Sequence, residues 1–271
     1  MKKHIASILF LFLLSTFQLI AQSHSVKRLG IEQGLSNNYV VSITQDKQGF
    51  LWFATEEGLN KFDGTRFTTY YKNDLTQDNQ GITGNELNRV YADTKHPIIW
   101  IATQRDGLNA YNYNEQTFTA YQHNPENPHS LITNDVTDIA PSTQHDDGLW
   151  ISTYYRGIEY LDITSGQFTH YNKSTVPSLP CDQTWTVLDG GDGNLYIGHV
   201  GSGFSIFSPK DKSVKNFRNE AGNPMSLPGN DVFCIIKDAN GNIWLGTNNG
   251  LALYDAANEN FITFKNNKND K

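Results

Sequence analysis

The sequence predicts an all-β protein, a β-propeller built from four-stranded antiparallel blades, with about five blades present in the 271 residues. Two observations lead to this prediction. Each copy of an internal repeat has room for four short strands, and a repeat of about 40–50 residues with four strands is typical of a propeller blade. In addition, an aromatic anchor recurs at intervals of roughly 48 residues in one local context. The anchors are Trp52, Trp100, Trp150, Tyr196 and Trp244.

Three further positions keep their spacing from the anchor. A small residue comes two positions later, and because side chains two apart share one strand face, this pair suits close packing of one sheet on the next. A glycine follows, where a turn with positive φ is expected. A large apolar residue then marks the fourth strand. In the last unit these are Gly246, Gly250 and Phe261.

The repeat divides the chain into five units, at about 35–71, 82–121, 131–171, 179–217 and 227–264. In the last unit the strands are expected near 231–237, 242–247, 251–254 and 261–264. The first two are joined by Ala-Asn-Gly-Asn, a hairpin signal because Asn and Gly tolerate positive φ. Polar connections rich in Asn, Pro and Gly read as loops between blades, so residues 22–271 are predicted to form one partial propeller.

Residues 26–29 align with the fourth strand of a unit. Every unit already has its own fourth strand, so this stretch is predicted to be a spare outer strand for a last blade that the chain does not contain. The chain then reads as the opening part of a longer propeller or as a truncated product, with sheet faces uncovered at both ends.

The first segment has the pattern of a secretory signal peptide. Lys2 and Lys3 precede an apolar stretch over residues 5–20, which is shorter than the roughly 20 residues of a membrane span. We predict a signal peptide over residues 1–21 with cleavage after Ala21, and therefore a periplasmic address; the alternative is an uncleaved N-terminal anchor.

The net charge of −7 disfavours nucleic acid and anionic membrane as direct partners. The two cysteines, Cys181 and Cys234, occupy different positions within their units and so form no repeated staple. An oxidising compartment would permit a bridge, but the sequence favours two unpaired thiols.

Two units share a full motif. In the fifth it reads Asn230-x-Val232-x-x-Ile235-x-x-Asp238-x-x-Gly241-x-x-Trp244-x-Gly246-Thr247-x-x-Gly250-Leu251-x-x-Tyr254. The first unit repeats it as Asn38-x-Val40-x-x-Ile43-x-x-Asp46-x-x-Gly49-x-x-Trp52-x-Ala54-Thr55, then Gly58-Leu59. The third unit has an insertion at 141–147, and the fourth departs most, with Tyr196, His199 and Phe204.

This motif resembles the two-component-regulator propeller repeat, as in the periplasmic sensor region of Bacteroidetes hybrid two-component systems. The resemblance implies a pair of seven-bladed propellers and a β-sandwich domain, followed by a membrane helix, a histidine kinase, a receiver and a helix-turn-helix domain. It also implies oligosaccharide ligands. The kinase would lie in a C-terminal part of the parent protein that this chain lacks.

The loops after the anchor strand vary while the framework stays fixed, and variable loops on a rigid scaffold are where binding usually occurs. Aromatic faces stack on sugar rings, and Arg and Gln supply hydrogen bonds to hydroxyls. The predicted ligand-binding residues are Tyr154, Tyr155, Arg156, Gln104, Arg105 and Trp185. The five anchors, which repeat in every unit, are predicted to pack the core instead.

No metal, cofactor or catalytic residue is predicted. The stretches at Asp189–Asn194 and Asp238–Asn242 loosely suggest calcium loops, but neither has the full ligand series of an EF-hand, and hairpin turns explain them. The histidines lack zinc-site spacing, and there is no Gly-x-Ser-x-Gly elbow.

The leading hypothesis is a non-catalytic, periplasmic ligand-sensing segment of a hybrid two-component regulator, with an oligosaccharide as ligand. Its other expected partners are the remaining propeller blades and a second sensor subunit in a dimer. The alternatives are a secreted propeller enzyme, such as a lyase or glycan hydrolase, and a protein-interaction platform.

Overall fold

The computed structural model describes residues 26–72 and 81–265, and within them it confirms the predicted fold. Twenty strands form five antiparallel sheets, each made of four consecutive strands. In the first two units the strands are β1 (Val40–Gln45), β2 (Leu51–Thr55), β3 (Gly58–Phe62), β4 (Phe67–Tyr70), β5 (Leu87–Ala92), β6 (Ile98–Thr103), β7 (Leu108–Asn112) and β8 (Thr117–Tyr121).

The third to fifth units complete the set. Their strands are β9 (Val136–Pro141), β10 (Gly148–Thr153), β11 (Gly157–Asp162), β12 (Gln167–Tyr171), β13 (Thr184–Asp189), β14 (Leu195–His199), β15 (Phe204–Phe207), β16 (Val214–Phe217), β17 (Val232–Lys237), β18 (Ile243–Thr247), β19 (Gly250–Asp255) and β20 (Asn260–Phe264). The predicted strands of the fifth unit differ from these by one residue at several ends.

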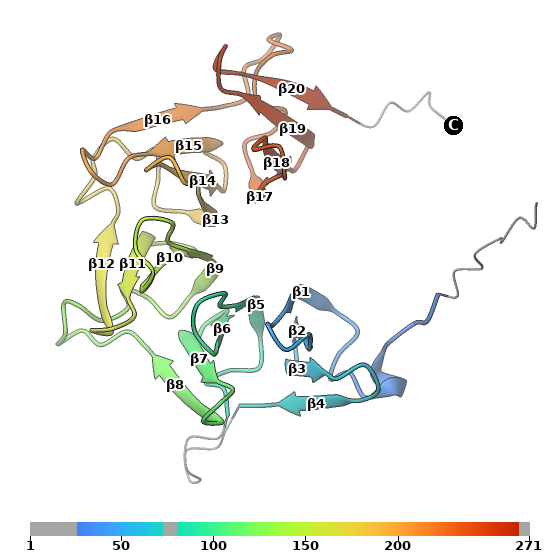
Figure 1. The fold of residues 1–271 in the computed structure, drawn as a ribbon. Helices are drawn as coiled ribbons and strands as arrows, with labels where there is room; N and C mark the ends of the chain where they lie inside the picture. Colours follow the sequence, from blue (N-terminus) through green and yellow to red (C-terminus); the bar gives the residue numbers. More distant parts are fainter. Residues whose placement is uncertain (1–25, 73–80, 266–271) are drawn as a thin grey trace, which may run out of the picture.

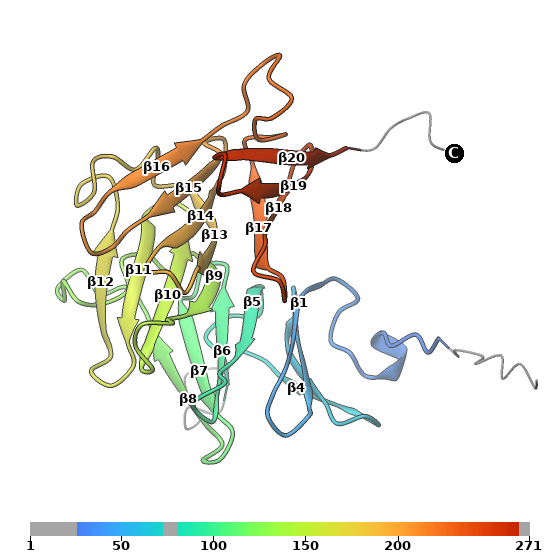
Figure 2. The same ribbon diagram turned by 45° about the horizontal axis from the view of Figure 1, so that its top comes forward.

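The five sheets stand around an arc, with the first strand of each unit innermost and the fourth outermost (Figure 1). Tilting the molecule shows the strands of each sheet side by side, running from one face of the arc to the other (Figure 2). The innermost strands β1, β5, β9, β13 and β17 contact one another in that order. The arc is open between the first and fifth units (Figure 1).

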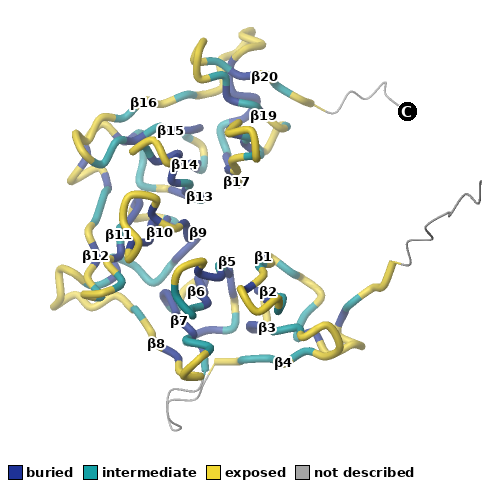
Figure 3. The backbone as a smooth tube through the Cα atoms, in the orientation of Figure 1, coloured by how far each residue is buried: buried dark blue, intermediate teal, exposed yellow. Residues whose placement is uncertain are grey.

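The core lies between successive sheets, where the tube is dark in Figure 3. Each of the first four anchors packs towards the following unit: for example, Trp52 joins a buried cluster with Ile99, and Trp100 joins one with Leu149. The small residue two positions later is required by close approach, because a Cβ on Gly198 would lie 2.8 Å from the carbonyl oxygen of Val232 in the next unit. The first four anchors, Trp52, Trp100, Trp150 and Tyr196, are buried.

Trp244 is only half-buried, because within the described residues nothing packs on the outward face of the fifth sheet. Apolar side chains on the two end sheets are exposed for the same reason. They include Val41 and Ile43 in the first unit and Ile236, Leu251, Ile262 and Phe264 in the fifth.

The indole N–H of the anchor is held by an aspartate at the end of the innermost strand. Trp52 Nε1 donates to Asp46 Oδ2 at 2.8 Å, and Trp100, Trp244 and their aspartates repeat the bond. The third unit has Ser142 at this position, and Trp150 Nε1 is buried without a hydrogen-bond partner in the described part of the chain.

The glycine after each second turn is also required. Gly58 has φ +109°, and a Cβ there would lie 2.8 Å from the carbonyl oxygen of Tyr70 in the outermost strand. Its amide donates to the carbonyl of Asn85, two residues before β5, at 2.8 Å. Gly107, Gly157 and Gly203 make the same bond to the residue two positions before the innermost strand of the following unit.

Other predictions fall at the edges of the described chain. The signal peptide at 1–21 lies outside the described residues. Residues 26–29 are described and form no strand, with Val26 fully exposed ahead of the 3-10 helix η1 (Ile31–Gln33), so the spare outer strand stays a prediction. Both cysteines are free thiols. Over the described ranges no helix has the length and hydropathy of a membrane span.

Candidate ligand-binding surface

The loops after the second strands are hydrogen-bonded to the residues that precede the next innermost strand, so the two lie together on one face. Besides the glycine bonds, the loop amides of Gln104 and Tyr154 donate to the carbonyls of Glu86 and Asp135, at 2.9 and 3.2 Å. Glu86 and Asp135 are the residues directly before the innermost strands β5 and β9. Hydrogen bonds therefore hold the variable loop against the start of the innermost strand of its own unit, while the glycine bonds hold it against the next unit.

The innermost strands contribute to this face through a β-bulge. In all five sheets the pairing between the first and second strands skips the second residue of the innermost strand. A bulged residue is released from the ladder, and bulges often re-aim a side chain next to a functional site. In the fourth and fifth units the bulged residues are Trp185 and Phe233.

These two rings continue a row of aromatic side chains that begins in the third unit. Ring centroids are 4.3 Å apart for Tyr155 and Tyr154, 5.9 Å for Tyr154 and Trp185, and 6.0 Å for Trp185 and Phe233. Each contact is edge-to-face, an arrangement that aromatic pairs prefer. We call these four residues the aromatic strip. It crosses three units, and Tyr155 and Phe233 remain 55% and 46% exposed.

Charged groups accompany the strip. Burial raises the pKa of Asp135, and the nearby Arg105 opposes that rise. Burial also raises the pKa of Tyr154, with smaller contributions from Tyr155 and from the Asp135 and Asp231 carboxylates. The carboxylate of Asp231 is already engaged, since it accepts from Gly201 N at 2.7 Å and from Asn248 Nδ2 at 2.8 Å. The carboxylate of Asp135 accepts no hydrogen bond from the other residues that the structure describes.

The structure brings together some of the predicted residues and leaves others apart. Tyr154, Tyr155 and Trp185 are in one row, and Arg105 interacts with Asp135 at its side. Gln104 and Arg156 are exposed, and their side chains form no hydrogen bond or ion pair with other described residues. Whether any of the six binds a ligand stays a prediction.

Sequence reasoning missed Phe233 and Asp135. A signal for Phe233 was present, because it occupies the same place in its unit as Trp185, one residue after the start of the innermost strand. Asp135 carried no comparable signal, since its role depends on the burial that the neighbouring loops create.

The departures of the fourth unit have a structural explanation. His199 replaces the threonine whose hydroxyl bonds the turn carbonyl in the other units, as Thr153 bonds Gly157 at 2.8 Å. His199 is buried, its Nε2 lies 2.8 Å from Ser205 Oγ, and burial lowers its pKa to about 4. Its Nδ1 lies 3.5 Å from Cys181 Sγ. The buried, neutral imidazole of His199 therefore has a structural role within the fourth sheet.

Hollows in the surface lie away from the strip. One of about 430 Å³ lies by the hairpin turns of the fourth and fifth units, beside Tyr196 and Lys237. Another of about 570 Å³ lies beside Asp147 and Tyr160 in the third unit. No cluster of three metal-ligating side chains occurs among residues 26–72 and 81–265. The hairpins at Asp189 and Asp238 are ordinary turns, and in the second the carboxylate accepts from Asn240 and Asn242 amides.

The fold and this face together define a propeller-repeat protein with a rigid framework and one variable, aromatic-bearing surface. Comparison with known proteins identifies the family of the repeat in two of the units. Residues 34–57 and 226–249 match the model of the two component regulator propeller family. These segments fall in the first and fifth units, the two that share the full motif, so the resemblance is confirmed and the chain carries two-component regulator propeller repeats.

The chain is 66% identical to the extracellular domain assigned to the hybrid two component system BT3049 of B. thetaiotaomicron, with a TM-score of 0.82 over 88% of this chain and 32% of that chain. The corresponding domain of BT4673 from the same organism shares the fold at 22% identity, with a TM-score of 0.72 over 90% of this chain and 34% of that one. This chain therefore spans about a third of each solved domain.

Histidine kinase P4 of Formosa agariphila is 42% identical over 66 residues, which make up 24% of this chain and 5% of that protein. Together, these matches indicate homology to the extracellular domain of a hybrid two-component system, which supports a sensor segment.

Proposed function

We propose that this chain is the exported ligand-sensing segment of a hybrid two-component regulator, and that the aromatic strip binds an oligosaccharide. The observation that supports the ligand class is the strip itself, a row of partly exposed rings at bulged strand positions and loop tips. The predicted signal peptide at 1–21 and the similarity to an extracellular domain both support export.

The chemistry of the strip suits a carbohydrate. Tyr and Trp present a broad apolar ring together with a polar atom, which matches the apolar faces and polar edges of a sugar. Arg105 and Asp135 lie beside the strip and can exchange hydrogen bonds with hydroxyl groups. Because the rings lie on three sheets, one ligand of several sugar units would contact the third, fourth and fifth units together.

The segment itself is proposed to be non-catalytic. Kinase activity would belong to the remainder of the longer regulator. The other proposed partners are the remaining blades of the propeller, which would cover the exposed apolar faces of the end sheets, and a second sensor subunit. A bound ligand would then act by favouring one arrangement of these partners over another.

The test is a titration of the intact exported region against a broad oligosaccharide panel by calorimetry, with product analysis of each mixture. We expect saturable binding of at least one glycan, at least tenfold weaker after Tyr154→Ala or Trp185→Ala. Tyr71→Ala is the matched control, since Tyr71 is an exposed tyrosine of the first unit outside the strip. It should leave binding unchanged.

Two results would contradict the proposal. Absence of binding across the panel argues against an oligosaccharide ligand. Consumption of a bound glycan, with new products, would instead support the alternative of a secreted lyase or glycan hydrolase.

A further inference from the structure

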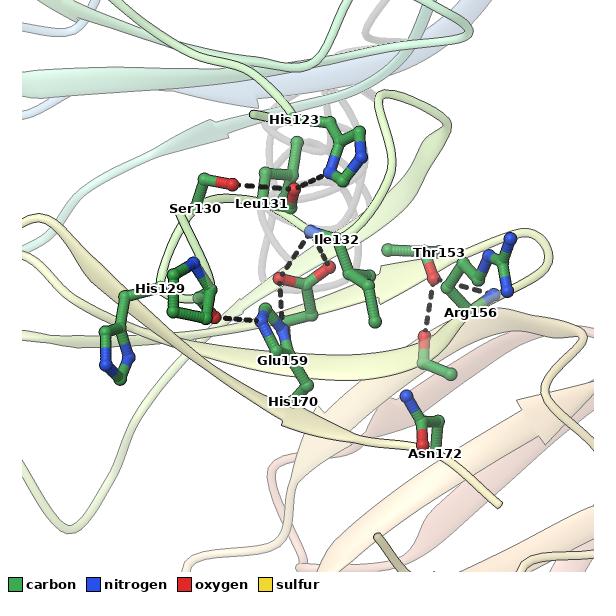
Figure 4. Close-up of polar contacts among 12 residues, drawn as sticks. His123, His129, Ser130, Leu131, Ile132, Thr153, Arg156, Glu159, His170 and Asn172 are labelled. Carbon is green, nitrogen blue, oxygen red and sulfur yellow. Dashed lines mark hydrogen bonds and ion pairs between the residues drawn. The ribbon is translucent and has the colours of Figure 1, made fainter. Parts of the chain in front are cut away.

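The third unit contains a buried acid and a histidine where the other units have neutral side chains. Glu159 on β11 is completely buried, and its Oε2 lies 3.2 Å from Nδ1 of His170 on β12 (Figure 4). Both carboxylate oxygens also accept from the amide of Ile132, at 3.0 and 3.3 Å. Ile132 belongs to the connection between the second and third units.

The other units show what this position does. In the first unit Asn60 Oδ1 accepts from Ser36 N at 3.0 Å, and in the second Asn109 Oδ1 accepts from Thr83 N at 3.0 Å. In the fourth and fifth units the matching connection residue is a proline, which has no amide hydrogen, and the strand position is not an amide or an acid. Those prolines are Pro180 and Pro228, and the corresponding strand residues are Ser205 and Ala252. A strong acceptor is thus present only where the connection offers a donor.

The choice of glutamate in the third unit follows from Ile132. Asn60 gives its own Nδ2 hydrogen to the hydroxyl of Ser36, at 2.7 Å. Ile132 has no hydroxyl, so an asparagine facing it would bury an unpaired N–H, which costs free energy. A carboxylate has no such hydrogen, but its charge needs a partner when buried. His170 stands directly opposite Glu159 in the strand register and supplies one.

His170 faces acceptors on both sides. Its Nε2 lies 2.9 Å from the carbonyl oxygen of Pro128, which is also in the connection. Its Nδ1 faces the Glu159 carboxylate (Figure 4). Nδ1 lies within ion-pair distance of the Glu159 carboxylate, but it is not aligned for a hydrogen bond and is buried without a hydrogen-bond partner among the described residues. A carbonyl and a carboxylate both accept, so only an imidazole protonated on both nitrogens can donate to Pro128 and also offset the charge of an ionised Glu159. The pair and its proton thus fix the connection at Pro128 and at Ile132.

We propose that Glu159 and His170 form a proton-dependent latch, which holds the connection at residues 128–132 on the third sheet and releases it when the shared proton leaves. The latch is a property of the unliganded fold and does not depend on the identity of any ligand. Asp135 follows three residues after Ile132, and its carbonyl accepts from Tyr154 N at 3.2 Å. The latch therefore supports the edge of the aromatic strip.

The pKa shifts of both latch residues favour a protonated pair at low pH. Interaction with Glu159 raises the pKa of His170, against the opposing effect of burial, and burial raises the pKa of Glu159. The nearby His123 lowers the pKa of Glu159 when charged, and its Nδ1 lies 2.8 Å from the carbonyl of Leu131. The remaining titratable groups in view are His129 and Arg156, both exposed (Figure 4).

The pH dependence of the latch follows from the linkage between proton binding and folding. A group whose pKa is raised by folding stabilises the fold fully below its ordinary value and loses that contribution as pH rises through the raised value. For His170 the ordinary value is 6.5, so the latch should be closed below that pH and open progressively above it. The raised pKa of Glu159 acts in the same direction.

The test is hydrogen exchange of the Ile132 amide, read by mass spectrometry in the full chain and expressed as a protection factor from pH 6 to pH 9. We expect protection to fall about tenfold as pH rises, the scale of losing one charge-assisted hydrogen bond. The Ser36 amide in the first unit, held by neutral Asn60, is the internal control and should keep its protection.

The matched variant is I132S/E159N/H170T, which copies Ser36, Asn60 and Thr69 of the first unit. It should protect residue 132 equally at both ends of the pH range. Should it not fold, His170→Gln alone serves, since it keeps one donor and cannot titrate. A flat profile in the unmodified protein, or an unchanged slope in the variant, would overturn the proposal.

Discussion

The first and third units form the same four-stranded antiparallel sheet but carry different polar side chains. In the first, Asp46 holds the indole of Trp52 and Asn60 holds the following connection. In the third, Ser142 replaces that aspartate, Glu159 replaces the asparagine, and aromatic residues occupy the loop after the second strand. The comparison teaches that apolar spacing and turn glycines are sufficient for the blade, while polar positions change together with their partners.

The largest effect is expected from the anchors, which are common to both units. Trp100→Ala should destabilise the protein by about 4 kcal/mol, since it empties a fully buried space between two sheets. Trp244→Ala should cost clearly less, because Trp244 is only half-buried. Denaturant unfolding of both variants makes the comparison, and equal losses would show that packing between sheets is not what the anchors provide.

Next comes the acceptor that holds the connection. Glu159→Ala should cost about 3 kcal/mol at pH 6, because it leaves the Ile132 amide without its acceptor and the partly buried His170 imidazolium without its counter-ion. Asn60→Ala in the first unit should cost about 2 kcal/mol, since it leaves only neutral groups unpaired. Urea titrations at the same pH compare the two. A Glu159 variant as stable as the parent would contradict the role of the acid.

A smaller change should make the third unit more like the first. Ser142→Asp should stabilise the protein by about 1 kcal/mol, because the new carboxylate can accept from the unpaired Nε1 of Trp150. The reverse change, Asp46→Ser, should cost a similar amount. Thermal unfolding measures both, and a loss of stability in Ser142→Asp would show that the third hairpin cannot accommodate the motif.

The sequence predicts the framework well because the framework is repetitive. The anchors, the small residue typified by Gly198 and the turn glycines typified by Gly58 each recur, so their register reveals four strands per blade. The candidate site is less predictable because it consists of exceptions. Tyr154 and Trp185 could be singled out as aromatic residues outside the register, whereas Glu159 and His170 meet only once β11 and β12 pair.

The half-buried state of Trp244 shows a second limit. Its spacing is that of the other anchors, so the sequence predicts burial. Burial, however, depends on whether another sheet packs on the outward face of the fifth unit, and that is a property of the packing partner.

The central claim is that framework and binding are separate in this molecule, and Tyr154→Ala tests it most directly. Tyr154 is half-exposed, so its loss should change the free energy of unfolding by less than about 0.5 kcal/mol. Calorimetric titration of the best glycan from the panel should nevertheless give an affinity at least tenfold weaker than that of the parent. An unchanged affinity, or a weakened one that merely follows a loss of folding, would contradict the account.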